Sequence, residues 1–178
     1  ALSSQFLDYL EKQYEFVEAL SPAVRDHLTV RLFLQDLEWE QILRWRDRHP
    51  MVALDDGERP ILDLLSESKL FITTNNGTAF LESISLGVPT IIFWDISRWE
   101  ILESAQPLFD ELTTVGVFHA TPRSAATHVS RIWSDVQSWW TSEQVVDVVT
   151  RFSDTYCRGG FDIVDEIRRN LLDLVRDE

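Results

Sequence analysis

The feature that most constrains the fold is a pair of apolar segments, 70–73 and 90–94, separated by a polar turn and a helical pattern. Both segments lack polar alternation, which predicts strands that are buried on both faces. The stretch 78–86 has helical spacing, and Gly87 followed by Pro89 predicts the end of that helix. Strand, helix and strand in this order are typical of a parallel sheet. We therefore predict an α/β fold in which helices cover both faces of a parallel sheet.

The rest of the chain continues this alternation and adds helices at both ends. Further strands are predicted at 27–34, 51–54 and 115–119, and the helices of the sheet at 38–47, 61–66 and 98–112. The additional helices are predicted at 6–19, from Thr121-Pro122 to about Trp140, at 143–156 and at 163–175. In the second of these, the helical spacing of Trp133, Trp139 and Trp140 favours packing over sugar stacking.

The composition limits the classes of function. A length of 178 residues suits one domain. A net charge of −14 argues against a general nucleic-acid binder, because affinity for a phosphate backbone requires clustered Lys and Arg. No apolar run reaches the roughly 18 residues of a membrane span, so we expect no transmembrane segment. The single cysteine, Cys157, fits a reducing compartment. We expect a cytoplasmic location, the inner face of the membrane included.

The polar turn after segment 70–73 carries the strongest chemical signal. It consists of Thr74, Asn75, Asn76, Gly77 and Thr78, and it follows a predicted parallel strand, where ligands bind in open α/β sheets. The backbone N–H groups of the turn lie at the N-terminus of the predicted helix, where the positive end of the helix dipole favours a phosphate. Gly77 allows the backbone to approach the phosphate closely, and Thr78 and Asn76 can cap the helix or bind the ligand. We expect these five residues to bind the phosphates of a nucleotide.

Glu82 adds a candidate for ribose binding. It lies one helical turn beyond Thr78, so the two side chains are expected on one face of the helix. A carboxylate at this place can accept both hydroxyl groups of a ribose. The glycine-rich dinucleotide fingerprint and the phosphate-loop lysine motif are absent, which argues against a nicotinamide site and an ATPase. The alternative is a tight strand-to-helix turn with a purely structural cap.

Charged residues at the ends of other predicted strands are further candidates. Arg98 and Asp95 follow segment 90–94, and a guanidinium matches phosphate oxygens in two-point geometry. His119 and Arg31 lie near the ends of two other strands and are candidate contacts of the same ligand. The alternatives are a solvated charge for Arg98 and a structural role for His119. The other histidines do not cluster with acidic residues or the cysteine at metal-ligand spacing, so we predict no metal site.

The order of residues 73–92 resembles the donor-binding turn of GT-B glycosyltransferases and of the related UDP-GlcNAc 2-epimerases. The shared order is Thr, Asn, Gly, Thr, then Leu-Glu, then Leu-Gly-Val-Pro-Thr-Ile. The chain is also similar, from about 27 to 156, to a family of bacterial transferases of surface polysaccharide and lipopolysaccharide biosynthesis. That similarity is carried by residues 91–95, 100–107, 115–119 and 125–126. The pair Asn75-Asn76 departs from the Ser, Gly or His that is frequent in GT-B members.

The resemblance implies one Rossmann-like lobe of a GT-B architecture, the C-terminal lobe that binds the nucleotide sugar. It implies a connecting helix in 1–26, the Rossmann-like lobe in 27–140 and C-terminal helices in 141–178, packed on this lobe or on its missing partner. The implied activity is transfer of a sugar from a nucleotide-sugar substrate to a surface carbohydrate acceptor. A missing N-terminal lobe would hold that acceptor, so the chain alone is expected to be inactive.

The resemblance also assigns roles within the site. Glu82 would hold the ribose, while the helix N-terminus and Arg98 would stabilise the leaving phosphate without a metal or a cofactor. Two alternatives stay open at this point. One is a lobe of a nucleotide-sugar epimerase of the UDP-GlcNAc 2-epimerase type, and the other is a non-catalytic interaction domain whose acidic surface binds a partner protein.

Overall fold

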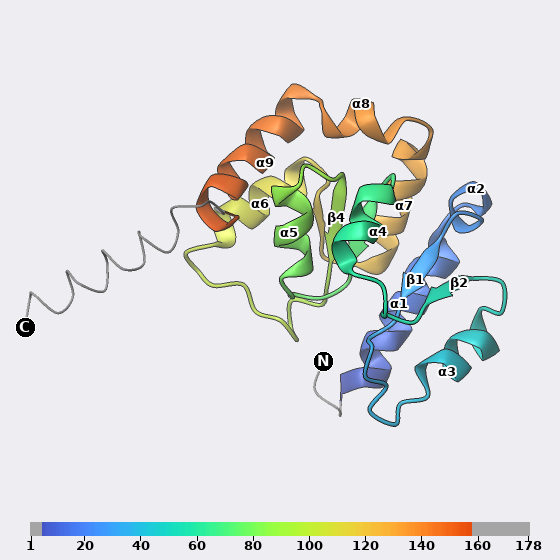
Figure 1. Ribbon diagram of the computed structural model, residues 1–178. Helices are drawn as coiled ribbons and strands as arrows, with labels where there is room; N and C mark the ends of the chain where they lie inside the picture. The colour runs from blue at the N-terminus through green and yellow to red at the C-terminus, as the bar shows by residue number, and fades with distance from the viewer. Residues whose placement is uncertain (1–4, 158–178) are drawn as a thin grey trace, which may run out of the picture.

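The computed structural model describes residues 5–157, with strand β4 (Thr90–Phe93) in the middle of a parallel sheet (Figure 1). The strand order is β3-β4-β5. Strand β3 (Phe71–Thr73) aligns Phe71 with Thr90, and β5 (Phe118–His119) aligns Phe118 with Ile92. The predicted α/β fold with parallel, Rossmann-like strands is therefore confirmed.

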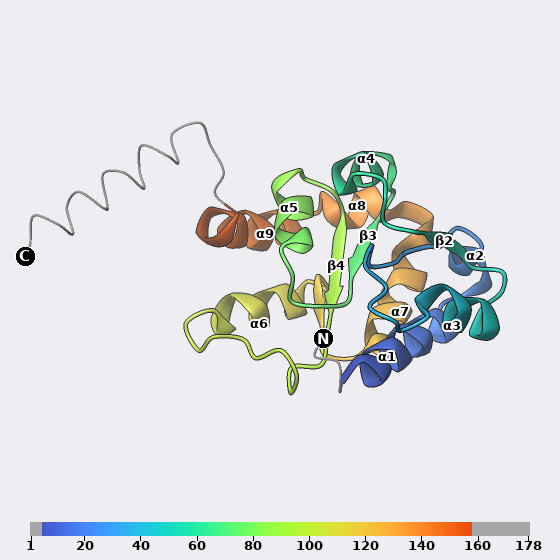
Figure 2. The same ribbon diagram turned by 60° about the horizontal axis from the view of Figure 1, so that its bottom comes forward.

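Side chains of β4 alternate between two apolar clusters, one on each face of the sheet. Ile91 and Phe93 join the cluster that contains helices α1 (Phe6–Ala19) and α7 (Pro122–Ile132). Ile92 and Trp94 join the cluster of α5 (Ala79–Ser85), α6 (Gln106–Thr114) and α9 (Glu143–Tyr156). Figures 1 and 2 show these two sets of helices on opposite sides of β4. The continuous apolar run of β4 arises because the strand is covered on both faces.

Helix α1 contributes directly to this core. Leu10, Tyr14, Phe16 and Val17 are buried, and the ring of Phe16 stacks on that of Phe93 with centroids 4.9 Å apart. An aromatic pair of this kind contributes about 1 kcal/mol beyond the area it buries. The helix that was expected to be a connection therefore also covers one face of the sheet.

Two further strands form a separate ladder, which shares no strand hydrogen bonds with the sheet of β3, β4 and β5. Strand β1 (Thr29–Arg31) pairs in parallel with β2 (Ala53–Asp55), and α3 (Gln41–Arg48) connects them. The prediction of a strand over 27–34 was wrong in length, because the chain leaves the ladder after Leu32, and Phe33 is 66% exposed. The short helices α2 and α4 flank this ladder, at Pro22–Arg25 and Ile61–Glu67.

Three predicted helices differ from the structure in their bounds, and the one expected at 38–47 is α3, which begins at Gln41 because Glu38 and Glu40 have positive φ. The helix expected at 98–112 is α6, which begins only at Gln106, because Pro107 fits the first turn of a helix but not its interior. The helix expected from Thr121-Pro122 to Trp140 is interrupted by a 3-10 turn, η2, at Trp133–Asp135. Asp135 then caps α8 (Val136–Trp140) by accepting a bond from the Ser138 amide at 3.0 Å.

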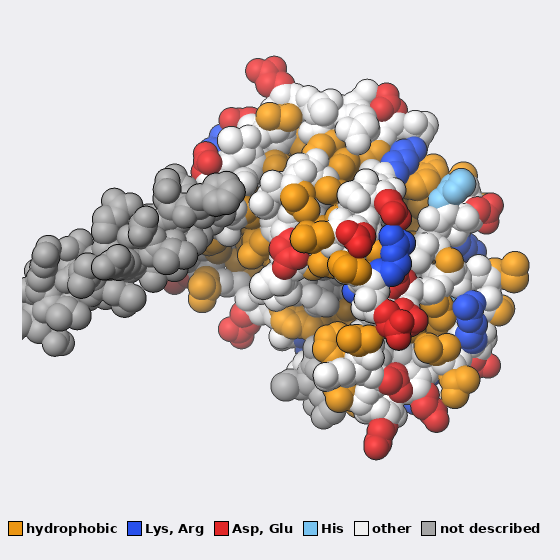
Figure 3. All heavy atoms as spheres, viewed as in Figure 1, with side chains coloured by type: hydrophobic (Ala, Val, Ile, Leu, Met, Phe, Trp, Pro, Cys, Tyr) orange, Lys and Arg blue, Asp and Glu red, His pale blue; other side chains and the backbone are white. Residues whose placement is uncertain are grey.

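The predicted helix at 163–175 lies outside the described residues. Among the described helices, none combines the length and apolar character required to cross a membrane. Acidic side chains are spread over much of the face shown in Figure 3, as the net charge of −14 implies.

Candidate functional site

The ends of the three sheet strands meet at a cavity of about 260 Å³. Thr74 follows β3, Asp95 follows β4, and Thr121 follows β5, and all three line this space, which we name the strand-end cavity. The carboxyl ends of parallel strands are where open α/β sheets bind their ligands, because the loops there diverge around a hollow. The topology of the sheet thus places polar side chains from separate loops around one space.

Helix α1 forms the opposite wall of the strand-end cavity. Tyr9 and Lys12 line the cavity from this helix. The Tyr9 hydroxyl lies 2.7 Å from Thr74 Oγ1, and Gln13 Nε2 donates to the same oxygen at 2.9 Å. Trp99, from the loop after β4, meets the Tyr9 ring edge-on with centroids 5.6 Å apart. The Tyr9 and Trp99 rings and the fixed Tyr9 hydroxyl therefore border the cavity on this side.

The charges in this cavity are of both signs. Arg98 and Lys12 line it together with Asp8 and Asp95. Arg98 Nη2 donates to Asp8 Oδ2 at 2.7 Å, with side chains that are 39% and 67% exposed, so water weakens this ion pair.

Asp95 is held in its charged form by its own loop. The hydroxyl and the amide of Ser97 donate to Asp95 Oδ1 at 2.6 and 2.9 Å. These two bonds, the hydroxyl first, hold the pKa of the Asp95 carboxyl below its usual value. The strand-end cavity therefore presents two cations beside an ionised carboxylate that can accept hydrogen bonds.

The polar turn after β3 lies only partly at the cavity. Thr74 lines it, and Asn75 Nδ2 donates to the Tyr9 hydroxyl at 3.3 Å. Asn76 is exposed and Gly77 is half-buried, and neither lines the cavity. A Cβ at position 77 would lie only 2.7 Å from Asn75 Oδ1. The group that lies close to the Gly77 backbone in the structure is therefore the side-chain amide of Asn75.

Thr78 and Glu82 lie on one face of α5, as their spacing predicted. The Thr78 hydroxyl donates to Glu82 Oε1 at 3.2 Å, and Glu82 is half-buried. Thr78 is the residue before the first turn of α5, but its side chain makes no capping bond to the helix backbone. The pair therefore leaves the first amides of α5 to other partners, and it lies outside the residues that line the strand-end cavity.

Arg31 and His119 lie away from the strand-end cavity. Arg31 belongs to β1 and donates to Asp55 Oδ1, Gly57 O and Arg59 O at 3.1, 2.8 and 2.7 Å. His119 is 8% exposed, with both ring nitrogens hydrogen-bonded. Of the predicted residues, Thr74, Asp95 and Arg98 line the strand-end cavity. Arg31 and His119 do not line it.

Most residues that line the strand-end cavity were not predicted from the sequence, among them Tyr9, Lys12, Trp99 and Thr121. Tyr9 and Thr74 are 65 positions apart, so no local spacing indicates that they meet. Among residues 5–157, no group of three or more His, Cys, Asp or Glu residues is arranged to hold a metal ion.

Comparison with known proteins identifies a family. A model of the LIC12162 family transferases matches residues 1–171 of the chain. Neither the curated proteins nor the solved structures contain a match.

Proposed function

Because the chain belongs to the LIC12162 family of transferases, we propose that it is the donor-binding half of a glycosyltransferase. In this proposal the strand-end cavity binds a nucleotide sugar. The observation that carries it is the convergence of Lys12 and Arg98 at the carboxyl ends of three parallel strands, beside Asp95 and the Tyr9 and Trp99 rings. The cations suit the phosphates of a nucleotide sugar, and the carboxylate can accept hydrogen bonds from its hydroxyl groups. The aromatic faces suit its base.

The phosphates would bind to Lys12 and Arg98. Each cation has an acidic partner that water reaches, since Lys12 Nζ lies 3.5 Å from the half-buried Glu15 Oε2 and Arg98 Nη2 lies 2.7 Å from the exposed Asp8 Oδ2. Exposed ion pairs of this kind are weak. A diphosphate carries more charge than one carboxylate, and a guanidinium can bind it at two points, so it would displace Asp8 from Arg98.

The rest of the donor would extend from this phosphate position. A volume of about 260 Å³ is small for a whole nucleotide sugar, so part of the ligand would lie along the turn that contains Thr74 and Asn75. That path leads toward the exposed Asn76 and Thr78 and toward Glu82, which would accept the ribose hydroxyls. Asp95 would accept hydroxyl hydrogens of the transferred sugar.

The same contacts would support the transfer step. The bond between the sugar carbon and the donor phosphate breaks, and the electron pair of that bond leaves on a phosphate oxygen. Lys12 and Arg98 would stabilise this developing negative charge, because donors fixed in advance need little reorganisation during the reaction. A hydroxyl oxygen of the surface carbohydrate acceptor would attack the same sugar carbon and form the new glycosidic bond, and its proton would pass to a base of the lobe that binds the acceptor.

A titration with UDP, CMP, GDP and CDP tests the proposal, with tryptophan fluorescence as the signal. Trp94 and Trp99 line the strand-end cavity, so a bound nucleotide should change their emission. We expect saturable binding of at least one nucleotide. Arg98→Gln should weaken it roughly tenfold or more, the typical value of a charge-assisted hydrogen bond.

Arg151→Gln is the matched control for this variant. Arg151 lies on α9, where it pairs with Glu111 and Asp147, so its loss removes the same charge away from the cavity. Its nucleotide affinity should equal that of the unchanged protein. If none of the four nucleotides shows saturable binding to a protein whose circular dichroism spectrum shows that it is folded, the proposal is refuted. That result would favour an interaction domain.

A further inference from the structure

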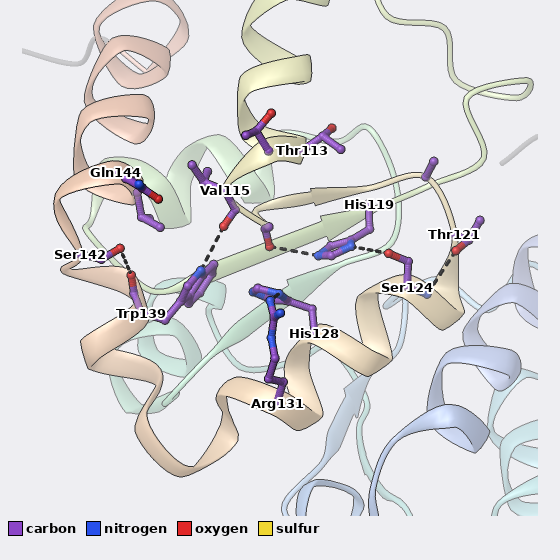
Figure 4. Close-up of a pocket in the computed structure, with 14 residues that line it drawn as sticks. Thr113, Val115, His119, Thr121, Ser124, His128, Arg131, Trp139, Ser142 and Gln144 are labelled. Atoms are coloured by element: carbon purple, nitrogen blue, oxygen red, sulfur yellow. Dashed lines mark hydrogen bonds between the residues drawn. The ribbon is translucent and has the colours of Figure 1, made fainter.

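A second cavity, of about 550 Å³, lies along β5, the strand at the edge of the sheet (Figure 4). We name it the histidine cavity after His119 and His128, which line it with residues of α6, α7 and the segment around α8. The lining includes the hydroxyls of Thr121, Ser124 and Ser142. Among the described residues that form it, none is a carboxylate, although the chain has 30 acidic residues. A negatively charged ligand would therefore meet no repulsion from its walls.

Arg131 is the cation of the histidine cavity. Its side chain contacts His128, one turn earlier on the same helix α7, where Nη2 lies 2.7 Å from Nδ1 (Figure 4). Within residues 5–157, no carboxylate lies within ion-pair distance of Arg131. Within the same residues, Arg25, Arg44 and Arg46 also lack a carboxylate partner, but they donate to backbone carbonyl oxygens. Among the described residues Arg131 donates only to the His128 ring, so its exposed guanidinium keeps N–H groups for an anion.

His128 supplies a buried donor without a partner. A guanidinium only donates, so His128 Nδ1 must accept the bond from Arg131, and the neutral ring carries its proton on Nε2. The residue is 7% exposed, and Nε2 has no hydrogen-bond partner among the described residues. A buried polar group without a partner is costly, and it is rare in folded proteins. A ligand acceptor that reaches this nitrogen after a small rotation of the ring would remove that cost.

His119 completes the electrostatics of the cavity. Its Nε2 lies 3.0 Å from the Gly116 carbonyl oxygen, which can only accept, so the neutral ring carries its proton there. Its Nδ1 then accepts from the Ser124 hydroxyl at 2.8 Å. The rings of His119 and His128 are 5.2 Å apart. Burial, followed by the nearby His119 and Arg131, lowers the pKa of His128 to about 4.

We propose that the histidine cavity binds a small hydroxylated molecule through its phosphate or carboxylate group. The oxyanion would bind to Arg131 and to the imidazole of His128. The hydroxyls of the ligand would bind to Ser142, Gln144 and Thr121, and its carbon skeleton would lie near Trp139, whose indole N–H is already bonded to the Val115 carbonyl. This site is separate from the strand-end cavity, with which it shares only the turn at Ala120 and Thr121.

Calorimetric titration with glucose 6-phosphate, gluconate and glucose tests this proposal. We expect saturable binding of at least one of the two anions and none of uncharged glucose. The comparison of glucose 6-phosphate with gluconate decides between a phosphate and a carboxylate ligand. Nuclear magnetic resonance should show a shift of the His128 ring signals on binding, and an upward shift of the pKa of His128, because a bound anion stabilises the charged ring.

Two variants on one helix make the test specific. Arg131→Gln should weaken binding of the anion at least about tenfold, since it removes the charged donor. Arg123→Gln removes the same charge from α7 at a side chain that faces Glu15 instead, and its affinity should not change. Three results would each overturn the proposal: no binding of either anion at about 10 mM, equal binding of glucose, or equal affinity of Arg131→Gln with unchanged circular dichroism.

Discussion

Acidification should destabilise the protein through His128. In the folded chain, the pKa of His128 is lowered to about 4 from an ordinary value of 6.5, by burial first and then by His119 and Arg131. The unfolded chain therefore binds more protons than the folded chain between these two values. The contribution of His128 to stability is fully present above about pH 6.5, and it is lost progressively as the pH falls to about 4.

The magnitude follows from the two pKa values. With 6.5 for the unfolded state and about 4 for the folded state, lowering the pH from 7.5 to 5 should cost about 2 kcal/mol through His128. The cost at complete protonation of both states is about 3 kcal/mol. The pKa of His119 is also lowered, mainly by burial, so this residue adds a loss of the same sign.

Urea unfolding at these two pH values, followed by tryptophan fluorescence, measures the effect. The unchanged protein should lose about 2 kcal/mol more on acidification than His128→Asn, in which the titrating ring is absent. His27→Asn, which removes an exposed histidine ring away from the histidine cavity, is the matched control. Equal losses in the unchanged protein and in His128→Asn would refute the reasoning, because the buried imidazole would then not be neutral in the folded state.

Two further substitutions follow from the contacts. Asp8→Asn releases Arg98 from its exposed partner, and the nucleotide affinity measured by fluorescence should rise roughly twofold to fivefold, whereas an unchanged affinity would mean that Arg98 does not contact the ligand. Gly116→Ala should lower the free energy of unfolding by roughly 2–5 kcal/mol, because Gly116 has a φ of +79° and a Cβ there would lie 2.4 Å from the His128 ring. Gly87→Ala, with a φ of +70° and open space around it, should cost only roughly 1–2 kcal/mol in the same urea experiment, and equal costs would contradict the close approach.

The central part of the fold could be predicted because its signals are local. The apolar run of β4 and the glycine and proline after α5 are contiguous in the sequence, and they indicate a covered parallel strand after a helix. The start of α6 was placed too early, although Pro107 marked the correct place. The Ser97 side chain and amide bond to Asp95 and hold that segment in a turn instead.

In the candidate site, only residues that directly follow a predicted strand could be predicted from the sequence. Asp95 and Arg98 directly follow β4, so the rule for strand ends places them correctly. Tyr9 and Lys12 were missed, because the packing of α1 across the sheet, and not any sequence spacing, brings them to the cavity. His119 was expected near a strand end with a structural alternative, and its two hydrogen bonds account for its burial.

A crystal structure of the chain soaked with the nucleoside diphosphate that binds best tests the central proposal most directly. We predict that the diphosphate lies in the strand-end cavity between Lys12 and Arg98, that the bond from Arg98 to Asp8 is replaced by bonds to phosphate oxygens, and that Glu82 contacts the ribose. A diphosphate bound away from both cations, with the Arg98 and Asp8 pair intact, would contradict the account.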